Sequence, residues 1–546
     1  MGVKHFWIWI NKHFSDCIQT NDEGIQIDNL CLDVNGIIHN SAQKVYKYGN
    51  FRQNRILKQI KRFGMKYRLE FFQEICNRIE HYFLTIKPRK RLIISIDGVA
   101  GLAKMFQQRQ RRYRSSEDKL DHTDFIPISL TPGTEMMDYI SKYIDWFIRL
   151  KISHFPEWKD VEVIFSSEKV PGEGEAKLLS YIRKYGDEYE SFCIYGADAD
   201  LIMLGLSSGY DKMYVIREDM RDYDVLYYVN VGLLASKLVN MMKWNDSKTF
   251  RRKNAILDFV FMCFLVGNDF LPTIPTLGIL ENGIDIMLDV YKSISSHITS
   301  ERNGIVKLRP KPLSQFFGTL AQYEKGMLED KQKSRERYFP DELLNSHTKF
   351  FNKDNVVVDF DGYRKEFYDK KFSHYNSSIE NEYIRGLEWV INYYKCGMPD
   401  WNWFFPHNYS PFLTDLARSA ESFKSIPFTR TDSFQPFLQL LYVIPYSHRN
   451  LLPLQLQHIV EKYEWHIDLS GKRREWEGII ILPNIDTKQI RKKYEELVDK
   501  VDAKYKRRNK IQKTVRYKRC IDTPSFWKSY YGNIIDCIAE TEILEL

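Results

Sequence analysis

Residues 171–175 read Pro-Gly-Glu-Gly-Glu, and residues 196–201 read Gly-Ala-Asp-Ala-Asp-Leu. Each stretch carries two carboxylates at positions i and i+2; the four are Glu173, Glu175, Asp198 and Asp200. Like charges this close repel one another, so a fold that brings the two pairs together needs a cation between them. Hard oxygen ligands in this number favour Mg²⁺ or a similar ion. The alternative is that both pairs are solvated charges in turns.

Four short apolar runs each lead to acids. Residues 25–36 carry Asp33 near their C-terminal end, and Asp97 follows the run at residues 92–96. The runs at residues 161–165 and 192–195 precede the two pairs quoted above. Segments with helical periodicity lie between the runs, at residues 71–83, 135–150 and 176–184. Strands that alternate with helices predict a parallel sheet, in which ligands gather at the carboxyl ends of the strands. The sequence therefore predicts an α/β fold with its acids at one edge of the sheet.

A further acid, Asp269, follows an apolar segment that is expected to be a buried helix, between Gly267 and Pro272. The candidate metal ligands and catalytic residues are then seven carboxylates: Asp33, Asp97, Glu173, Glu175, Asp198, Asp200 and Asp269. Seven negative charges cannot share a site without cations, and two divalent ions together with partial protonation or outer-shell waters would balance them. Two such ions close together are the arrangement that cleaves phosphodiester bonds. The sequence shows no Ser-His-Asp or Cys-His pattern and no phosphate-binding G-x-x-x-x-G-K-[ST] loop.

Residues 103–114 carry five basic side chains and no acid. On a helix, three of them and one glutamine would share one face by their spacing: Lys104, Gln108, Arg111 and Arg112. Three cations and an amide on one face suit a terminal phosphate, because arginine makes forked contacts to phosphate oxygens. The alternative is an ordinary solvated basic helix.

Composition is consistent with a polyanion partner. The 546 residues carry a net charge of +8, and residues 488–519 alone hold 14 Lys/Arg against 4 Asp/Glu. The eight cysteines form no C-x-x-C pair and are expected to be reduced thiols in an intracellular protein, cytoplasmic with a nuclear location left open. No segment is apolar enough to suggest membrane insertion, and no protein partner can be derived.

The chain is expected to divide into four parts. We predict a metal-dependent nuclease domain over residues 1–295, a linker with helices over 296–353, a second conserved region over 354–487 and a basic tail over 488–546. The second region is rich in aromatics, which more often form a core than stack on bases. The tail is predicted to be a basic helix that ends in a short apolar segment.

At several places the chain resembles the nuclease core of the Xrn-type 5′→3′ exoribonucleases. The matching stretches, in order along residues 1–487, are residues 1–7, 32–40, 96–100, 103–114, 131–135, 171–177, 195–205, 264–272, 386–394, 401–406 and 475–478. Departures from the family pattern lie at Lys4, Gly101, Leu102 and Phe106, the last three beside the basic stretch.

The resemblance implies a PIN-like, Rossmann-related parallel-sheet nuclease domain with a second, mainly helical and aromatic-rich region that closes the active site. It implies two Mg²⁺ ions, with Mn²⁺ possible, held by the seven carboxylates. It assigns the 5′-phosphate pocket to the four residues of the basic face, and base stacking to His39 and Trp401.

The implied activity is the stepwise release of 5′-mononucleotides from single-stranded RNA that bears a 5′ monophosphate, with a functional link to a decapping activity in mRNA decay. Two other functions remain open. A structure-specific DNA nuclease of the flap-endonuclease kind would share the acidic core, although the glycine-rich hairpin expected after the last acid is absent from the sequence after Asp269. A non-catalytic RNA-binding relative would keep the fold alone.

Overall fold

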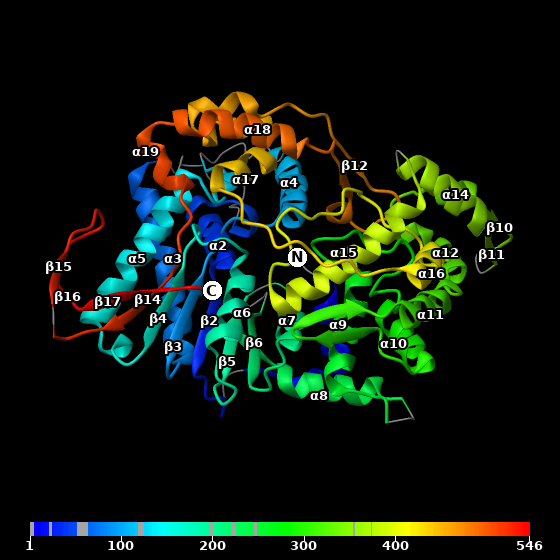
Figure 1. Cartoon of the computed structure of the whole chain (residues 1–546), viewed down its shortest axis with the longest axis horizontal. Helices are drawn as coiled ribbons and strands as arrows, with labels where there is room; N and C mark the ends of the chain where they lie inside the picture. Colours follow the sequence, from blue (N-terminus) through cyan, green and yellow to red (C-terminus); the bar gives the residue numbers. More distant parts are fainter. Residues whose placement is uncertain are drawn as a thin grey trace.

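A mixed sheet of nine described strands crosses the molecule in the order β1-β7-β6-β5-β2-β3-β4-β14-β17. The computed structural model describes residues 5–20, 24–51, 64–117, 125–196, 198, 200–219, 225–244, 248–352, 355–372, 374–522 and 524–546. The strands are β1 (Ile18–Thr20), β2 (Asn29–Asp33), β3 (Arg91–Ser95), β4 (Glu162–Ser166), β5 (Phe192–Tyr195), β6 (Met213–Glu218), β7 (Leu226–Asn230), β14 (Thr514–Arg519) and β17 (Ala539–Leu544). In Figure 1 the sheet occupies the left half and the centre of the view.

The middle of this sheet is parallel and buried on both faces. Strands β6, β5, β2, β3 and β4 pair in parallel, and the outer strands pair antiparallel. Leu30 and Leu32 face one apolar cluster and Cys31 faces another, because successive side chains of a strand point to opposite faces. Continuous apolar runs are typical of parallel strands that are covered on both sides.

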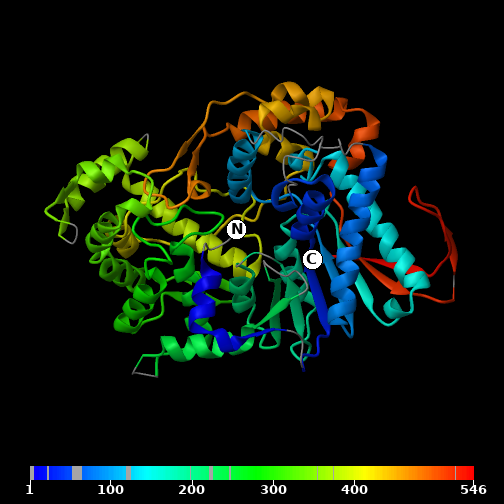
Figure 2. The ribbon, with the colours of Figure 1, turned by 180° about the vertical axis from the view of Figure 1, so that it is seen from behind.

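Helices cover each face of the sheet. The cluster around Leu30 includes α2 (Val34–Tyr46), α3 (Met65–Ile86) and α5 (Glu135–His154). The cluster around Cys31 includes α6 (Gly174–Tyr185), α7 (Asp200–Ser208), α8 (Val231–Met242) and α9 (Arg252–Leu265). Helix α1 (Phe6–His13), dark blue in Figure 2, packs its Phe6 against Phe259 of α9 at 6.3 Å. The predicted α/β fold with a parallel core is confirmed.

The second half of the chain is mainly helical; its described helices up to residue 422 lie in the right half of Figure 1, and the later ones lie at the top of the view, over the sheet. Its helices are α10 (Gly283–Ile294), α11 (Pro310–Ala321), α12 (Glu324–Lys333), α13 (Glu342–Ser346), α14 (Phe360–Lys371), α15 (Ser377–Cys396), α16 (Leu413–Ser422) and α17 (Pro436–Val443). Short hairpins accompany them: β8 (Thr299–Arg302) with β9 (Ile305–Leu308), β10 (Thr348–Phe350) with β11 (Val356–Val358), and β12 (His466–Asp468) with β13 (Ile479–Ile481). The aromatic-rich helical region predicted from the sequence is therefore present.

The four-part division stays a prediction, but two of its parts take an unexpected form. Phe316 and Phe317, in the predicted linker, are fully buried in the same core as α15 and α16, so this range packs as part of the helical region. The helix predicted for the tail is found in α18 (Thr487–Leu497) and α19 (Ala503–Lys506). Beyond Asn509 the helix prediction is wrong.

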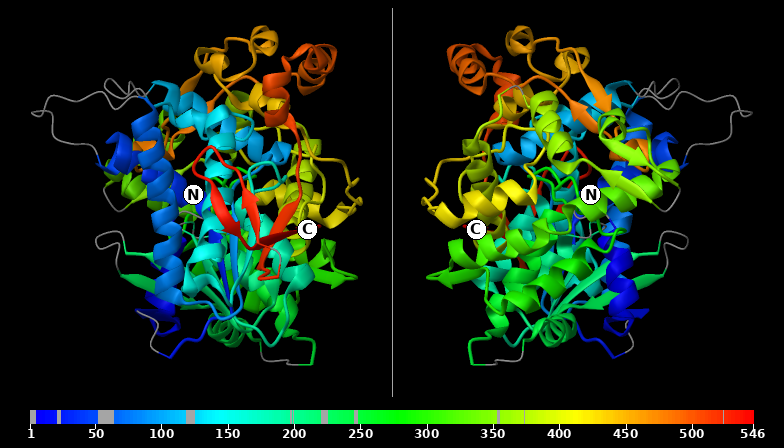
Figure 3. Two further views of the ribbon diagram at one scale, coloured as in Figure 1. Left: turned by 90° about the vertical axis from the view of Figure 1, so that its left-hand side faces the viewer. Right: turned by 90° about the vertical axis from the view of Figure 1, so that its right-hand side faces the viewer.

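The end of the chain instead forms strands. Strand β14 pairs antiparallel with the edge strand β4, with Tyr517 opposite Val163, and β17 extends the sheet further. Helix gives way to strand here because Val515 and Tyr517 alternate with Arg516 and Lys518, the period of a half-buried strand. A small hairpin of β15 (Ser525–Trp527) and β16 (Ile534–Cys537) follows, red in Figure 3. None of the described helices is both long and apolar enough to span a bilayer.

Candidate active site

The carboxyl ends of β2, β3, β4 and β5 lie side by side, and the acids of the sequence motifs follow them directly. Asp33 is the last residue of β2 and caps α2, its Oδ1 accepting a hydrogen bond from the backbone N of Asn35 at 3.4 Å. Asp97 comes two residues after β3 ends. Glu173 and Glu175 begin α6, where the helix dipole favours negative charge.

A glycine allows these strand ends to approach one another. The backbone N of Gly174 donates a hydrogen bond to Asp97 Oδ1 at 2.7 Å. A Cβ atom on Gly174 would lie 2.5 Å from Asp33 Oδ1, too close for any side chain. Glycine at this position therefore brings the start of α6 against the acids of two neighbouring strands.

Asp269 is placed by a tight turn after α9. Gly267 has φ +124°, which L side chains rarely adopt. The side chain of Asn268 then accepts hydrogen bonds from the backbone N atoms of Phe270 at 2.8 Å and Leu271 at 2.9 Å. The turn points the Asp269 carboxylate at Lys104, whose Nζ lies 2.8 Å from Asp269 Oδ2. The sequence prediction that Asp269 is set by a tight turn is confirmed.

Lys104, on helix α4 (Leu102–Glu117), joins the acids from the opposite side. Its Nζ also pairs with Glu173 Oε2, and the side chain is nearly buried. Burial by itself lowers the pKa of a lysine, but Asp269, Glu173 and Glu175 together raise the pKa of Lys104 well above its ordinary value. In turn, Lys104 holds the pKa of Asp269 below its ordinary value against the effect of burial.

Within the described residues, three other acids of the cluster form no ion pair of this kind, although the charge of Lys104 acts to lower the pKa values of two of them, Glu175 and Asp200. Burial raises the pKa of Asp33 well above its usual range, and repulsion from Asp97, Asp198 and Asp200 adds to this. Burial, Asp200 and Glu173 do the same for Glu175. The pKa of Asp200 rises to about 7 through burial and the charges of Asp269 and Asp198. This part of the site therefore holds more negative charge than the surrounding groups compensate.

The donor set suits divalent cations. All of the clustered ligands are carboxylate oxygens, which Mg²⁺ and Mn²⁺ prefer. Within the described part of the chain, Asp200 Oδ1 is buried and has no hydrogen-bond partner, as expected for an atom that is reserved for a ligand. As the side chains stand in the described residues, no three His, Cys, Asp or Glu groups are close enough together to enclose an ion. The carboxylate ligands therefore fit divalent ions. In this structure Lys104 balances part of their negative charge.

The basic face predicted on α4 is divided between two places. Lys104 lies among the acids, one helical turn before Gln108 and about two turns before Arg111 and Arg112. Arg112 donates to Gln108 Oε1 at 3.1 Å and to Thr131 Oγ1 at 3.0 Å, and Arg111 is exposed. Burial and the charge of Arg111 lower the pKa of Arg112 to about 9, so that it is still charged at neutral pH.

His39 lies close to these arginines. The protein atoms packed around its ring, together with the charges of Arg111 and Arg112, lower its pKa to about 4, although solvent still reaches the side chain. His39 is therefore a neutral ring beside two cations, which suits a base-stacking surface next to a phosphate site. Trp401 is half-buried, and its backbone O accepts a hydrogen bond from Leu102 N at 2.8 Å, so it lies at the start of α4. The roles of His39, Trp401 and the phosphate residues stay predictions.

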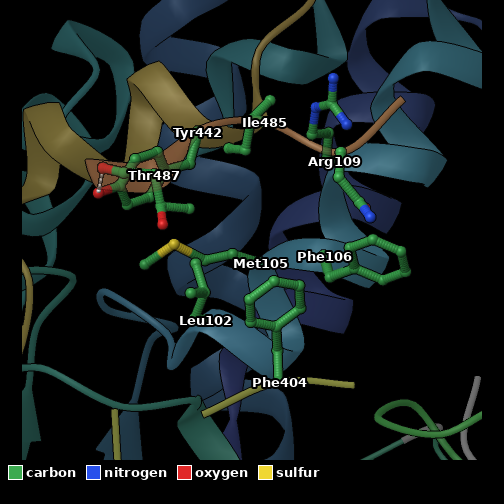
Figure 4. A pocket seen from close by; sticks show the side chains of 9 residues that line it. Leu102, Met105, Phe106, Arg109, Phe404, Tyr442, Ile485 and Thr487 are labelled. Atoms are coloured by element: carbon green, nitrogen blue, oxygen red, sulfur yellow. Dashed lines mark hydrogen bonds between the residues drawn. The ribbon is translucent and has the colours of Figure 1, made fainter. Parts of the chain in front are cut away.

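Leu102 and Phe106, where the chain departs from the family pattern, lie on the opposite side of α4 from Lys104, Gln108 and Arg112. Both line a small apolar hollow with Met105, Phe404 and Tyr442, shown in Figure 4. Arg109 lies on the same side of α4 and donates to the backbone O of Pro483 at 2.7 Å. These side chains therefore join α4 to the second region and do not line the face that carries Gln108 and Arg112.

One residue of the site was not predicted from the sequence. The hydroxyl of Tyr393, on α15, donates a hydrogen bond to Glu173 Oε1 at 2.6 Å. Tyr393 belongs to the stretch 386–394 that carries the family resemblance, but nothing in its local pattern points to a carboxylate 220 residues away.

Comparison with known proteins gives consistent similarities along the whole chain. The family described as "XRN 5′-3′ exonuclease N-terminus" matches residues 1–219, and the one described as "Xrn1 helical domain" matches residues 249–352 and 341–525. The catalytic core of Rad2 in complex with DNA substrate, a solved structure, is 14% identical with a TM-score of 0.33, over 60% of this chain and 76% of that one.

Three curated relatives are similar to nearly the whole length of this chain. The chain is 27% identical to 5′-3′ exoribonuclease 1 of Saccharomyces cerevisiae, over 100% of this chain and 46% of the yeast protein. It is 29% identical to 5′-3′ exoribonuclease 1 of Homo sapiens, over 100% of this chain and 37% of the human protein. It is 27% identical to the 5′-3′ exoribonuclease 2 homolog of Drosophila melanogaster, over 93% and 72% of the two chains. The chain thus spans less than half the length of the first two relatives.

Proposed function

The chain belongs to the XRN 5′-3′ exonuclease family, and from this premise we propose that it is a metal-dependent 5′→3′ exoribonuclease that degrades RNA with a 5′ monophosphate. The observation that carries the proposal is the set of acids at the ends of four adjacent parallel strands, three of which have raised pKa values and form no ion pair among the described residues. Such a cluster is costly to bury unless it binds cations. A cation site beside a basic helix is suited to a phosphate substrate.

Two divalent ions, Mg²⁺ or Mn²⁺, would be held by Asp33, Asp97, Glu173, Glu175, Asp198, Asp200 and Asp269. When bound, such ions supply an activated water and stabilise the negative charge on the leaving oxygen. The reaction adds water across the first phosphodiester bond: the water oxygen joins the phosphorus, the bond from phosphorus to the 3′ oxygen breaks, and that oxygen takes up a proton. The phosphate remains on the second nucleotide, so each cycle regenerates a 5′ monophosphate.

The recognition of the 5′ end falls to the basic face of α4. Gln108, Arg111 and Arg112 would bind the terminal phosphate, with the neutral ring of His39 stacking on the first base and Trp401 a further stacking candidate. Lys104 was expected in this pocket. Because it pairs with Glu173 and Asp269, we assign it first the task of compensating the acids before the ions bind. A pocket that closes around a single phosphate would disfavour capped and triphosphate ends by size.

The cellular role follows from this end preference. Removal of a cap leaves a 5′ monophosphate, so we propose that the protein degrades mRNA after a decapping activity has acted. A cytoplasmic location, with the nucleus as the other candidate, stays a prediction.

A test of the proposal uses 3′-labelled single-stranded RNA with a 5′ monophosphate, triphosphate or hydroxyl, in Mg²⁺. We expect decay of the monophosphate substrate to mononucleotides, and its loss in Asp200→Asn and in EDTA. The matched control is Asp211→Asn, which neutralises an exposed acid whose ion-pair partner among the described residues is Arg252 at 3.4 Å. Cleavage inside the chain, equal use of the three ends, or preference for a flapped DNA would contradict the proposal and favour the flap-endonuclease alternative. Binding without any cleavage would favour a non-catalytic relative.

A further inference from the structure

Helix α15 belongs to the second region, and stacked aromatic side chains on it reach the carboxylate site. Tyr393, near its C-terminal end, is buried, and its hydroxyl donates to Glu173 Oε1 at 2.6 Å. The second region thereby reaches into the cluster that the sheet assembles. This contact joins one face of the helical region directly to a candidate metal ligand.

Neighbouring rings hold Tyr393 in place on two sides. Its ring stacks on Trp389, one turn earlier, with centroids 5.3 Å apart and planes 7° apart. Phe270, which follows Asp269, meets the same ring edge-on at 5.0 Å. Trp389 in turn stacks on Trp403 at 5.1 Å and is fully buried. A side chain packed this closely presents its hydroxyl in one direction.

Glu173 is held at both of its oxygens. Tyr393 binds Oε1 and Lys104 binds Oε2. A carboxylate oxygen can accept two hydrogen bonds or ligand contacts, so each oxygen of Glu173 keeps one acceptor position after these contacts. The two donors therefore fix the orientation of the carboxylate and leave acceptor positions on its oxygens for an ion. Without the hydroxyl, Glu173 would be oriented by Lys104 alone, and both oxygens could turn toward that ammonium group.

We infer that Tyr393 is a positioning residue that orients Glu173 for divalent-ion binding, so that docking of α15 completes the metal site. The inference rests on the proposed function only for its effect on catalysis, because its first consequence is on ion affinity. Tyr393 touches a carboxylate and not the substrate, and it acts through Glu173.

The test compares Tyr393→Phe with a matched control, Tyr291→Phe. The phenylalanine keeps the stacked ring and removes only the hydroxyl. Tyr291 is also fully buried and donates to a buried carboxylate, Asp258 Oδ2, at 2.8 Å, but this pair lies outside the carboxylate site. Both variants lose one buried hydroxyl-to-carboxylate hydrogen bond, and Tyr291→Phe also loses the contact of its hydroxyl with His297 Nδ1 at 2.9 Å. The control therefore disturbs its buried surroundings at least as much, so a loss of ion affinity confined to Tyr393→Phe reports on the ion site.

The first readout is calorimetric titration of Mn²⁺ into the protein without RNA. We expect Tyr393→Phe to weaken the affinity about 10-fold or more, the range seen when the partner of a metal ligand is removed, and Tyr291→Phe to leave it within twofold. The second readout is the nuclease rate as a function of Mg²⁺. Tyr393→Phe should need about tenfold more Mg²⁺ for half-maximal rate, recover at saturating Mg²⁺, and keep the KM for RNA within about twofold.

Two results would overturn the inference: an unchanged Mn²⁺ affinity in Tyr393→Phe, or an equal loss in both variants, which would indicate general loosening of the core. Thermal melting in EDTA checks that both variants fold. A wild-type protein that binds Mn²⁺ but degrades no RNA would refute the proposed function, and the affinity comparison would still decide the role of Tyr393. If RNA decay is seen while Tyr393→Phe behaves as the wild type, only this inference falls.

Discussion

The carboxylate site has two parts that differ in how their charge is balanced. Glu173 and Asp269 share the ammonium group of Lys104, and Glu173 also accepts from Tyr393. Asp33, Glu175 and Asp200 are equally enclosed, but the groups that face them are mostly other acids, and their pKa values are raised. The protein therefore compensates one part from within and leaves the other to an external cation. The second part is where we expect ions to contribute most to stability and catalysis.

The largest effect should come from Asp200→Asn, in the part without a cation. Loss of a direct ligand should reduce the exonuclease rate by more than about 100-fold, beyond the range for residues that only support a ligand. The same change relieves repulsion with Asp198 and Asp269, so the melting temperature in EDTA should rise by about 1–2 °C. Rate assays and melting curves measure the two effects. A fall in both activity and EDTA stability would show that Asp200 is compensated after all.

In the other part, Lys104→Met should destabilise the ion-free protein. Removing one partner of a buried ion pair costs about 3–5 kcal/mol, because the remaining charges are left without compensation. Urea unfolding in EDTA measures this loss, and Mg²⁺ should restore part of it by replacing the missing cation. Lys104→Arg, which keeps the charge, is the control and should lose less. Equal stability of Lys104→Met and wild type would refute the role assigned to this lysine.

The raised pKa of Asp200 predicts a pH dependence with a definite sign. A carboxyl group whose pKa is about 7 in the folded protein and near 4 when unfolded binds more protons when folded, so stability falls as pH rises between these values. From pH 6 to pH 8 this group alone should remove about 1.4 kcal/mol in EDTA. Asp200→Asn should show a shallower slope. With Mg²⁺ the trend should reverse, since ions compete with protons for the same oxygens.

The smallest and most direct comparison exchanges one acid in each part. Glu175→Gln removes a charge that Asp200 and Glu173 repel, and should stabilise the ion-free protein by about 1 kcal/mol. Glu173→Gln removes the partner of Lys104 and should destabilise it by a similar amount. The urea concentrations at the unfolding midpoint, measured in EDTA for both variants and the wild type, test these two expectations. Changes of the same sign would mean that the two parts are not electrostatically distinct.

Much of the site could be predicted because its signals are local. An apolar run followed by an acid identifies a strand end, and parallel strands put such ends at one edge, so these patterns predict the positions of Asp33, Asp97, Glu173 and Glu175. The face of α4 was also predictable, since helical spacing alone determines which side chains align. The partners of those side chains were not predictable from the spacing. Lys104 shares the face of Gln108, yet it pairs with two acids from distant segments.

Local sequence patterns are enough to predict the parallel α/β core and the positions of the acids at its strand ends, because strand and helix periods depend on neighbouring residues, and the motifs are enough to identify the family. The pairing of Lys104 with Glu173 and Asp269, the contact of Tyr393 with Glu173 across 220 positions, and the pairing of β14 with β4 become visible only in the folded chain. These pairings follow from which buried groups need a partner once the helical region docks on the sheet. Burial makes an unpaired charge costly, and burial is a property of the packed molecule.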